Sequence, residues 1–204
     1  MTIGERPMRA DARRNHERLV SAARDAFAQS GADAPLDDIA RRAGVGPGTL
    51  YRHFPTRQAL LAAVYRGDVD RLDTQATALA GTLAAPEALA AWLWLMLDHA
   101  KQKRGLGSAV KAMLADDAET STYCRGTVRG AVNRLLTAAR ETGDVRPDVD
   151  ADDVLRLVHG LGIALESVPD HADRLLGIVL DGLRPQPDRS GPAGPVSRSP
   201  ERPG

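Results

Sequence analysis

Two short helices joined by a tight turn are predicted in the segment 36–54, and this hairpin restricts the fold more than any other part of the sequence. Gly44 supplies the left-handed turn residue that a side chain would penalise. Pro47 suits the first turn of the second helix. Leu50 and Phe54 lie four residues apart, so both anchor that helix on a core from one face. A turn glycine, a proline at the start of a helix and two apolar anchors in this order predict a helix-turn-helix.

The outward face of the second helix has the side chains that a DNA reader needs. The N-terminal part of a recognition helix lies in the major groove, where Arg52 can grip a guanine with two hydrogen bonds. Arg57, in the first turn of the following helix, can reach the DNA backbone. An ordinary helical hairpin with a solvated polar face is the competing interpretation. The candidate DNA-binding residues are Pro47, Gly48, Thr49, Tyr51, Arg52, His53 and Arg57.

Helical periodicity runs through the rest of the chain, and no strand-like alternation is visible, so the fold class is all-α. Thr56 is expected to cap a longer helix that links the first domain to the rest. Asp150 or Asp152 is expected to cap a helix near the C-terminus. The expected helices are 11–30, 36–43, 47–54, 57–72, 86–100, 108–114, 121–140, 151–166 and 171–183.

Charge is unevenly distributed, although 27 basic and 27 acidic side chains cancel over the whole chain. Residues 1–66 contain 11 basic and 7 acidic residues, and the remainder is acidic by the same margin. A basic front predicts that any nucleic-acid contact is made there. The expected organisation is a flexible basic arm (1–10), a helix-turn-helix DNA-binding domain (11–66), a helical ligand-binding and dimerisation domain (67–183) and a disordered tail (184–204).

Several classes of protein are disfavoured by what the sequence lacks. Cys124 is the single cysteine, which excludes an intrachain disulfide and fits a reducing cytosol. The N-terminus has no apolar signal segment, and the longest apolar run, 89–97, is far shorter than the ~20 residues of a membrane span. No metal-ligand spacing, phosphate loop or nucleophile motif is present. We therefore expect a cytoplasmic protein that is not an enzyme, with no cofactor, metal or membrane partner.

The segment 13–69 resembles the N-terminal domain of TetR-family regulators, above all in DIARRAGV (38–45) and GTLYRHFPTRQALL (48–61). The resemblance implies a repressor that binds a palindromic double-stranded operator as a homodimer and is released by a small molecule. By position, Thr49, Tyr51, His53 and Arg57 match phosphate contacts, and Pro47, Gly48 and Arg52 lie where bases are read. The sequence departs from the pattern at Pro35 and Gly46, where the family usually has a side chain that caps a helix.

The resemblance also implies roles for the second half of the chain. Dimerisation is expected on the last two helices, although these can instead pack only internally. The candidate dimer residues are Val158, Leu161, Leu165, Leu175, Leu176, Val179 and Leu183. A cavity between helices is expected to hold an apolar or aromatic effector, although each candidate can instead be plain core. The candidate ligand-binding residues are Trp92, Met96, His99, Met113, Tyr123 and His159.

Two alternatives stay open at this point. One is a helical ligand- or protein-binding module that has lost sequence-specific DNA binding, which the zero net charge and the missing caps favour. The other is a DNA-binding protein that activates transcription or responds to no ligand.

Overall fold

The structure, a computed structural model, describes residues 5–102, 106–165 and 167–185, and in these ranges it is helical with no β-strand. The predicted all-α fold is confirmed. The elements are α1 (Glu5–Ser30), α2 (Leu36–Arg42), α3 (Pro47–His53), α4 (Arg57–Ala80), α5 (Ala85–Gln102), α6 (Gly107–Asp116), α7 (Ala118–Glu141), α8 (Ala151–Ala164), the 3-10 helix η1 (Pro169–His171) and α9 (Ala172–Leu183).

Helix boundaries follow local chemistry. α1 and α7 end at glycines with positive φ, Gly31 and Gly143. The Thr56 hydroxyl accepts a hydrogen bond from the Ala59 amide at 3.1 Å, which caps α4 as predicted. Asp150, rather than Asp152, caps α8, and its backbone amide in turn donates to Asp153.

The first helix begins earlier than the sequence predicted. α1 starts at Glu5, so residues 5–10 are helical and do not form the expected loose arm. Pro7 is compatible with this because it lies in the first turn, where its missing N–H costs no intrahelical hydrogen bond. Residues 1–4 and 186–204, which include nearly all of the predicted tail, lie outside the described residues.

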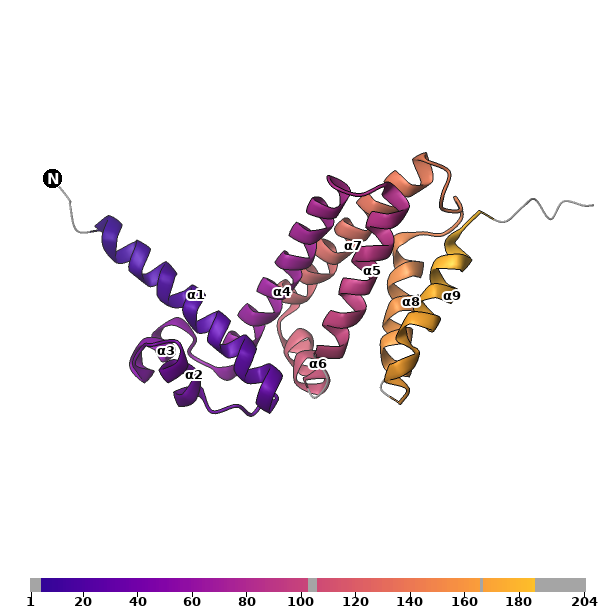
Figure 1. Cartoon of the computed structure of the whole chain (residues 1–204). Coiled ribbons are helices and arrows are strands. Elements are labelled where there is room, and N and C mark those ends of the chain that lie inside the picture. Colours follow the sequence, from indigo (N-terminus) through magenta and orange to yellow (C-terminus); the bar gives the residue numbers. More distant parts are fainter. Residues whose placement is uncertain (1–4, 103–105, 166, 186–204) are drawn as a thin grey trace, which may run out of the picture.

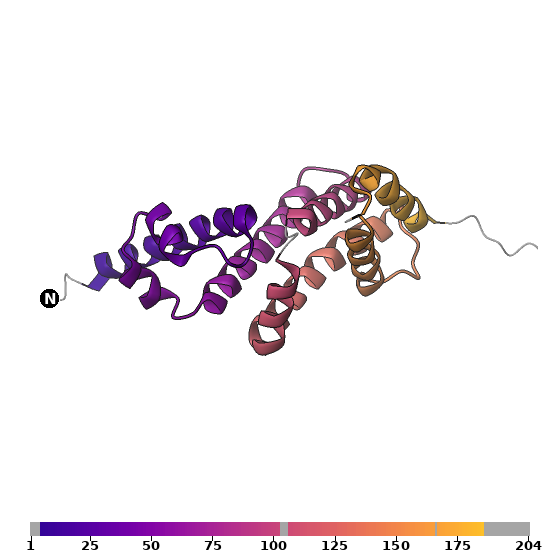
Figure 2. The same ribbon diagram turned by 90° about the horizontal axis from the view of Figure 1, so that it is seen from below.

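The molecule is elongated, with α1–α3 at one end and α8 and α9 at the other (Figures 1 and 2). α4 runs between the two ends and contributes to both hydrophobic cores. Its first turns bury Leu60 and Leu61 with α1–α3, whereas Leu72 and Ala76 pack with α5 and α7–α9. The predicted boundary at 66/67 therefore lies inside one continuous helix. Among the described residues, no helix is long and apolar enough to cross a membrane.

Candidate nucleic-acid interface and ligand groove

The hairpin has the geometry of a helix-turn-helix. Gly44 adopts a φ of +66° between α2 and α3, and the Val45 amide closes the turn by donating to the Ala40 carbonyl at 3.0 Å. Leu50 and Phe54 are buried in the core of the head, as their spacing predicted. The turn and these two anchors fix the orientation of α3 and leave its opposite side open.

The opposite side of α3 is the recognition face, which consists of Pro47, Gly48, Thr49, Tyr51, Arg52 and His53. Thr49 and His53 are half-buried and the others are exposed. No atom lies within 4 Å of the Cβ position that a side chain at Gly48 would add. The fold therefore does not require glycine at this position. Because Gly48 has no side chain, a partner has room to approach the backbone of α3.

Arg52 differs from the other arginines of the head. Among the described residues 10–66, it is the one arginine for which the structure places no hydrogen bond or ion pair, and its side chain is exposed. A guanidinium without an internal partner keeps all its donors for a ligand. The arginines that do have partners are Arg13, Arg14, Arg18, Arg24, Arg41, Arg42, Arg57 and Arg66.

Arg57 has a structural contact that the sequence did not indicate. Its Nη1 donates to the carbonyl oxygens of Ala32, at 2.7 Å, and Ala34, at 2.6 Å. These bonds tie the loop between α1 and α2 to the start of α4, since Arg57 is the first residue of that helix. Contact with a phosphate remains a prediction for Arg57, and positioning of the head is a role that its geometry supports.

His53, at the end of α3, lies against α1. Its ring is 6.0 Å from that of His16, which in turn lies 4.8 Å from the ring of Phe54. Burial lowers the pKa of His16 below its ordinary value, and the neighbouring His53 lowers it further. Although His16 stays partly exposed, this shift favours its neutral form at neutral pH.

The caps missing from the sequence are also missing from the structure. Neither Pro35 nor Gly46 provides a side-chain hydrogen bond at the start of α2 or α3. Backbone hydrogen bonds close both turns instead, with the Gly46 carbonyl accepting from the Thr49 amide at 2.9 Å. The fold tolerates the two departures.

Two family models match consecutive parts of the chain. Residues 19–64 match the N-terminal model described as "Bacterial regulatory proteins, tetR family". Residues 84–185 match "Transcriptional regulator SbtR-like, C-terminal domain". The chain belongs to the TetR family. It is therefore a DNA-binding transcriptional regulator and not an enzyme, as the sequence predicted.

Known regulators resemble both the whole fold and the head of this TetR-family chain. A TetR transcriptional regulator from Streptomyces coelicolor is 39% identical, with a TM-score of 0.72 over 84% of this chain and 99% of that one. A TetR regulatory protein from Mycobacterium vanbaalenii is 36% identical, with a TM-score of 0.69 over 87% and 99%. The Escherichia coli regulator UidR is 34% identical over 65 residues, which cover 31% of this chain and only 33% of UidR.

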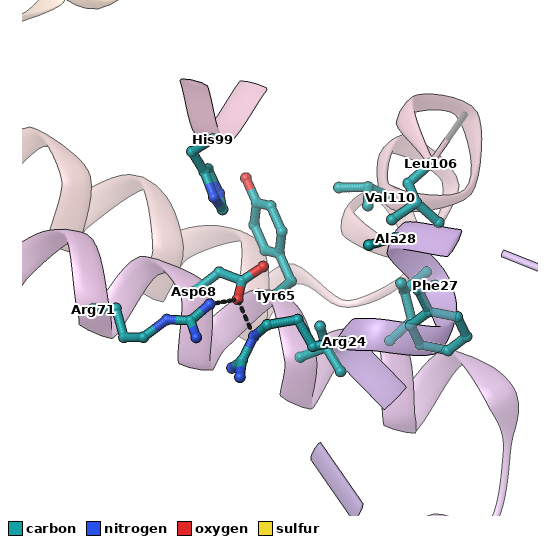
Figure 3. Close-up of a pocket in the computed structure, with 11 residues that line it drawn as sticks. Arg24, Phe27, Ala28, Tyr65, Asp68, Arg71, His99, Leu106 and Val110 are labelled. Atoms are coloured by element: carbon teal, nitrogen blue, oxygen red, sulfur yellow. Dashed lines mark hydrogen bonds and ion pairs between the residues drawn. The ribbon is translucent and has the colours of Figure 1, made fainter. Parts of the chain in front are cut away.

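An ionic contact joins the head of this TetR-family regulator to the connecting helix (Figure 3). The carboxylate of Asp68, in α4, accepts from Arg24 Nε of α1 at 2.8 Å and also from Arg71. Asp68 is buried, and a buried charge is stable only when it is paired. The contact borders a cavity of about 50 Å³ that His99 also lines.

Three of the six predicted ligand-binding residues line neither this cavity nor the larger groove between α7 and α8. Trp92 is fully buried, and its indole N–H donates to the Leu72 carbonyl at 2.9 Å, so it is core. Met113 is buried in the core of the head. Tyr123 is exposed on α7, where its hydroxyl donates to Asp70 at 2.6 Å. For Trp92 and Met113 the alternative interpretation as plain core therefore applies, whereas the sequence did not predict the exposed position of Tyr123.

Met96 and His159 come together in a groove of about 760 Å³ between α7 and α8, whereas His99 lies in the small cavity described above. The sequence did not identify the other lining residues, because helical periodicity does not show which faces of two helices meet. They are Tyr65, Cys124, Arg125, Gly126, Val128, Arg129, Asp152, Leu155 and Arg156. Within the described ranges, no group of three histidine, cysteine, aspartate or glutamate side chains can hold a metal ion.

The predicted dimer residues divide into two groups. Val158, Leu165, Leu176 and Leu183 are buried in the C-terminal core of the same chain and cannot form a surface. Leu161, Leu175 and Val179 are half-buried against that core. The exposed apolar side chains of α8 and α9, which the sequence did not single out, are Leu157, Ile163 and Ile178. Leu157 and Ile178 together are named the far face.

Proposed function

We propose that this TetR-family regulator is a repressor that binds a palindromic operator as a homodimer and is released by a small molecule. Arg52 carries the DNA-binding part of the proposal. It is exposed in the recognition face without an internal partner, and arginine is the commonest reader of guanine in the major groove. Gly48, four residues earlier, allows the backbone of α3 to approach the bases.

The far face supports dimerisation. Leu157 is 50% exposed and Ile178 is 57% exposed, so a second copy seated on them would remove apolar surface from water. α8 and α9 lie at the opposite end of the molecule from α3 (Figure 1), so pairing there leaves both heads free. A two-fold dimer presents two recognition helices, which read successive major grooves when they are ~34 Å apart.

Release by a small molecule is supported by the position of α4. Tyr65, in α4, lines the groove, and Asp68, one turn later, binds Arg24 of the head. A ligand that contacts Tyr65 in only one arrangement of α4 shifts the population of head positions. Release by a small molecule is excluded if a ligand that occupies the groove between α7 and α8 leaves operator affinity unchanged.

The experiment is selection of binding sites from random duplex DNA with purified protein, followed by a salt titration on the selected site. We expect an inverted repeat bound by a dimer, with affinity that falls steeply as salt rises. Arg52→Gln should relax base preference at one position in each half-site, whereas Lys111→Gln, an equal loss of charge at an exposed position of α6, should not. A reporter gene that carries the site distinguishes repression from activation. If no sequence is enriched even at low salt, the protein is instead a ligand- or protein-binding module.

A further inference from the structure

The groove between α7 and α8 is unusually rich in arginine for a site expected to bind an apolar molecule. Arg125, Arg129 and Arg156 line it, against the single carboxylate of Asp152. The lining therefore carries two more positive than negative charges, before any contribution from His159. A concave surface with an excess of one charge concentrates ligands of the opposite charge.

Two of the three arginines are available to a ligand. Arg129 is paired with Asp152, at 3.1 Å. Arg125 contacts no carboxylate of a described residue, and its guanidinium donates only to the hydroxyl and carbonyl of Ser121 in its own helix. Arg156 lies 3.6 Å from Asp153, whose other carboxylate oxygen already accepts from the Asp150 amide in the capping box. Arg125 and Arg156 therefore face the groove from two helices with donors to spare.

The remaining lining is apolar. Met96, Val128 and Leu155 are half-buried and pack against the C-terminal core, and the Cys124 thiol is buried. Burial raises the pKa of Tyr65 above its ordinary value, and the nearby Cys124 and Asp68 raise it further, so the tyrosine hydroxyl stays protonated at neutral pH. A volume of about 760 Å³ lies within the range of small-molecule sites.

We propose that this groove binds a small organic carboxylate, and that the effector belongs to this chemical class. The carboxylate lies on Arg125 and Arg156, because the planar guanidinium fork matches its two oxygens. The apolar body lies against Met96, Val128 and Leu155. The proposal rests on the effector part of the proposed function and narrows it from apolar or aromatic molecules to amphipathic anions.

The groove remains accessible in the proposed dimer. Residues three and four apart share a face of a helix, so Asp152, Leu155, Arg156 and His159 form one face of α8. Leu157, Gly160 and Ala164 form the neighbouring face by the same rule. Ile163, four residues after His159, lies on the groove side by the same rule, so the dimer interface that leaves the groove to a ligand is centred on Leu157 and Ile178.

The test is calorimetric titration of the full chain with four carboxylates (hexanoate, decanoate, phenylacetate and 2-naphthoate) and with the uncharged amide of each. At least one carboxylate should bind about tenfold or more tightly than its amide, since exposed charge-assisted hydrogen bonds contribute at the lower end of their range. This preference should shrink in Arg125→Gln and in Arg156→Gln, and as salt rises. Lys111→Gln, an equal charge loss at an exposed position of α6 outside the groove, should retain it. Thermal melts establish that each variant is folded.

If no carboxylate binds more tightly than its amide, or if Arg125→Gln and Arg156→Gln both retain the preference, the inference is overturned. Operator affinity is measured on the same protein, so the two failures can be separated. A protein that binds its operator but shows no carboxylate preference overturns the inference and leaves the DNA-binding proposal intact. A protein with the preference but without an operator supports the inference and overturns the repressor proposal.

Discussion

The two ends of the molecule expose opposite chemistry. The recognition face presents a free guanidinium, a glycine backbone and small polar groups, whereas the far face presents Leu157 and Ile178. Interfaces with DNA are polar, charged and wet, while the buried centres of protein interfaces are apolar and depleted of charge. Surface chemistry therefore supports a different proposed partner for each end, nucleic acid for the recognition face and a second copy for the far face.

The two ends are also held to α4 differently. The head is attached by apolar contacts and the buried Asp68–Arg24 ion pair. On the other side of α4, Leu72 and Ala76 likewise make apolar contacts, but the ion pair there, Arg134 with Asp73 at 2.6 Å, is more exposed. Exposed ion pairs stabilise little, whereas loss of one partner of a buried pair is costly. The head and the first half of α4 are therefore expected to move together.

A charge placed on the far face is expected to have the largest effect. Ile178→Glu places a carboxylate in the proposed interface twice, because a two-fold interface repeats every residue. Burial of an unpaired charge is strongly unfavourable, so we expect dimer dissociation to increase about 100-fold, equivalent to about 3 kcal/mol, with a parallel loss of operator affinity. Sedimentation and operator titration measure both.

The matched control is Ala78→Glu, which adds the same charge at an exposed position of α4. It should leave both quantities unchanged. An Ile178→Glu protein that remains a dimer and binds DNA normally would place the interface elsewhere.

The second prediction separates Arg57 from Arg52, which the sequence treated alike as DNA contacts. Arg57→Gln removes two hydrogen bonds that hold the α1–α2 loop, so the free energy of unfolding should fall by about 1–3 kcal/mol. Arg52→Gln should leave stability unchanged, because Arg52 has no internal partner among the described residues. Chemical denaturation in the absence of DNA tests the pair, and equal stability of the two variants would exclude the positioning role of Arg57.

The head could be predicted in detail because its local signals determine its geometry. Gly44, Pro47 and Thr56 each allow one backbone arrangement or cap, and Leu50 and Phe54 have only one small core to enter. The exception is Arg57, whose partners are carbonyls of a loop more than twenty residues away. A sequence pattern contains no information on such a distant backbone contact.

The second half could be predicted only as a set of helices. α8 and α9 have apolar residues on more than one side, so periodicity marks both Val158 and Leu157 without showing that the first is buried and the second exposed. Trp92 and Met113 entered cores for the same reason. The arginines of the groove come together only because a particular face of α7 meets a particular face of α8.

A third prediction sharpens the interpretation of the recognition face. Gly48→Ala has open space for its methyl group and favours the helix, so stability should be unchanged or higher by up to about 1 kcal/mol. Operator affinity should nevertheless fall about tenfold, within the 1–3 kcal/mol that overpacking of a close contact costs. Gly107→Ala, at an equally open site in α6, should affect stability in the same way but leave operator affinity unchanged. If Gly48→Ala binds the operator as well as the unmodified protein, the DNA does not approach this part of α3 closely.

The smallest expected effect is a pH dependence of the head. The pKa of His16 is lowered in the folded protein, so below the unfolded pKa of about 6.5 the unfolded chain binds more protons than the folded one. The contribution of His16 to stability is therefore present above that pH and is lost as the pH falls from about 6.5 towards the folded pKa. The melting temperatures at pH 7.5 and 5.5 should differ less in His16→Gln than in the unmodified protein. His171→Gln, an exposed histidine at the other end of the chain, should retain the full difference, and an equal reduction in both variants would exclude the contact with His53 and Phe54 as its source.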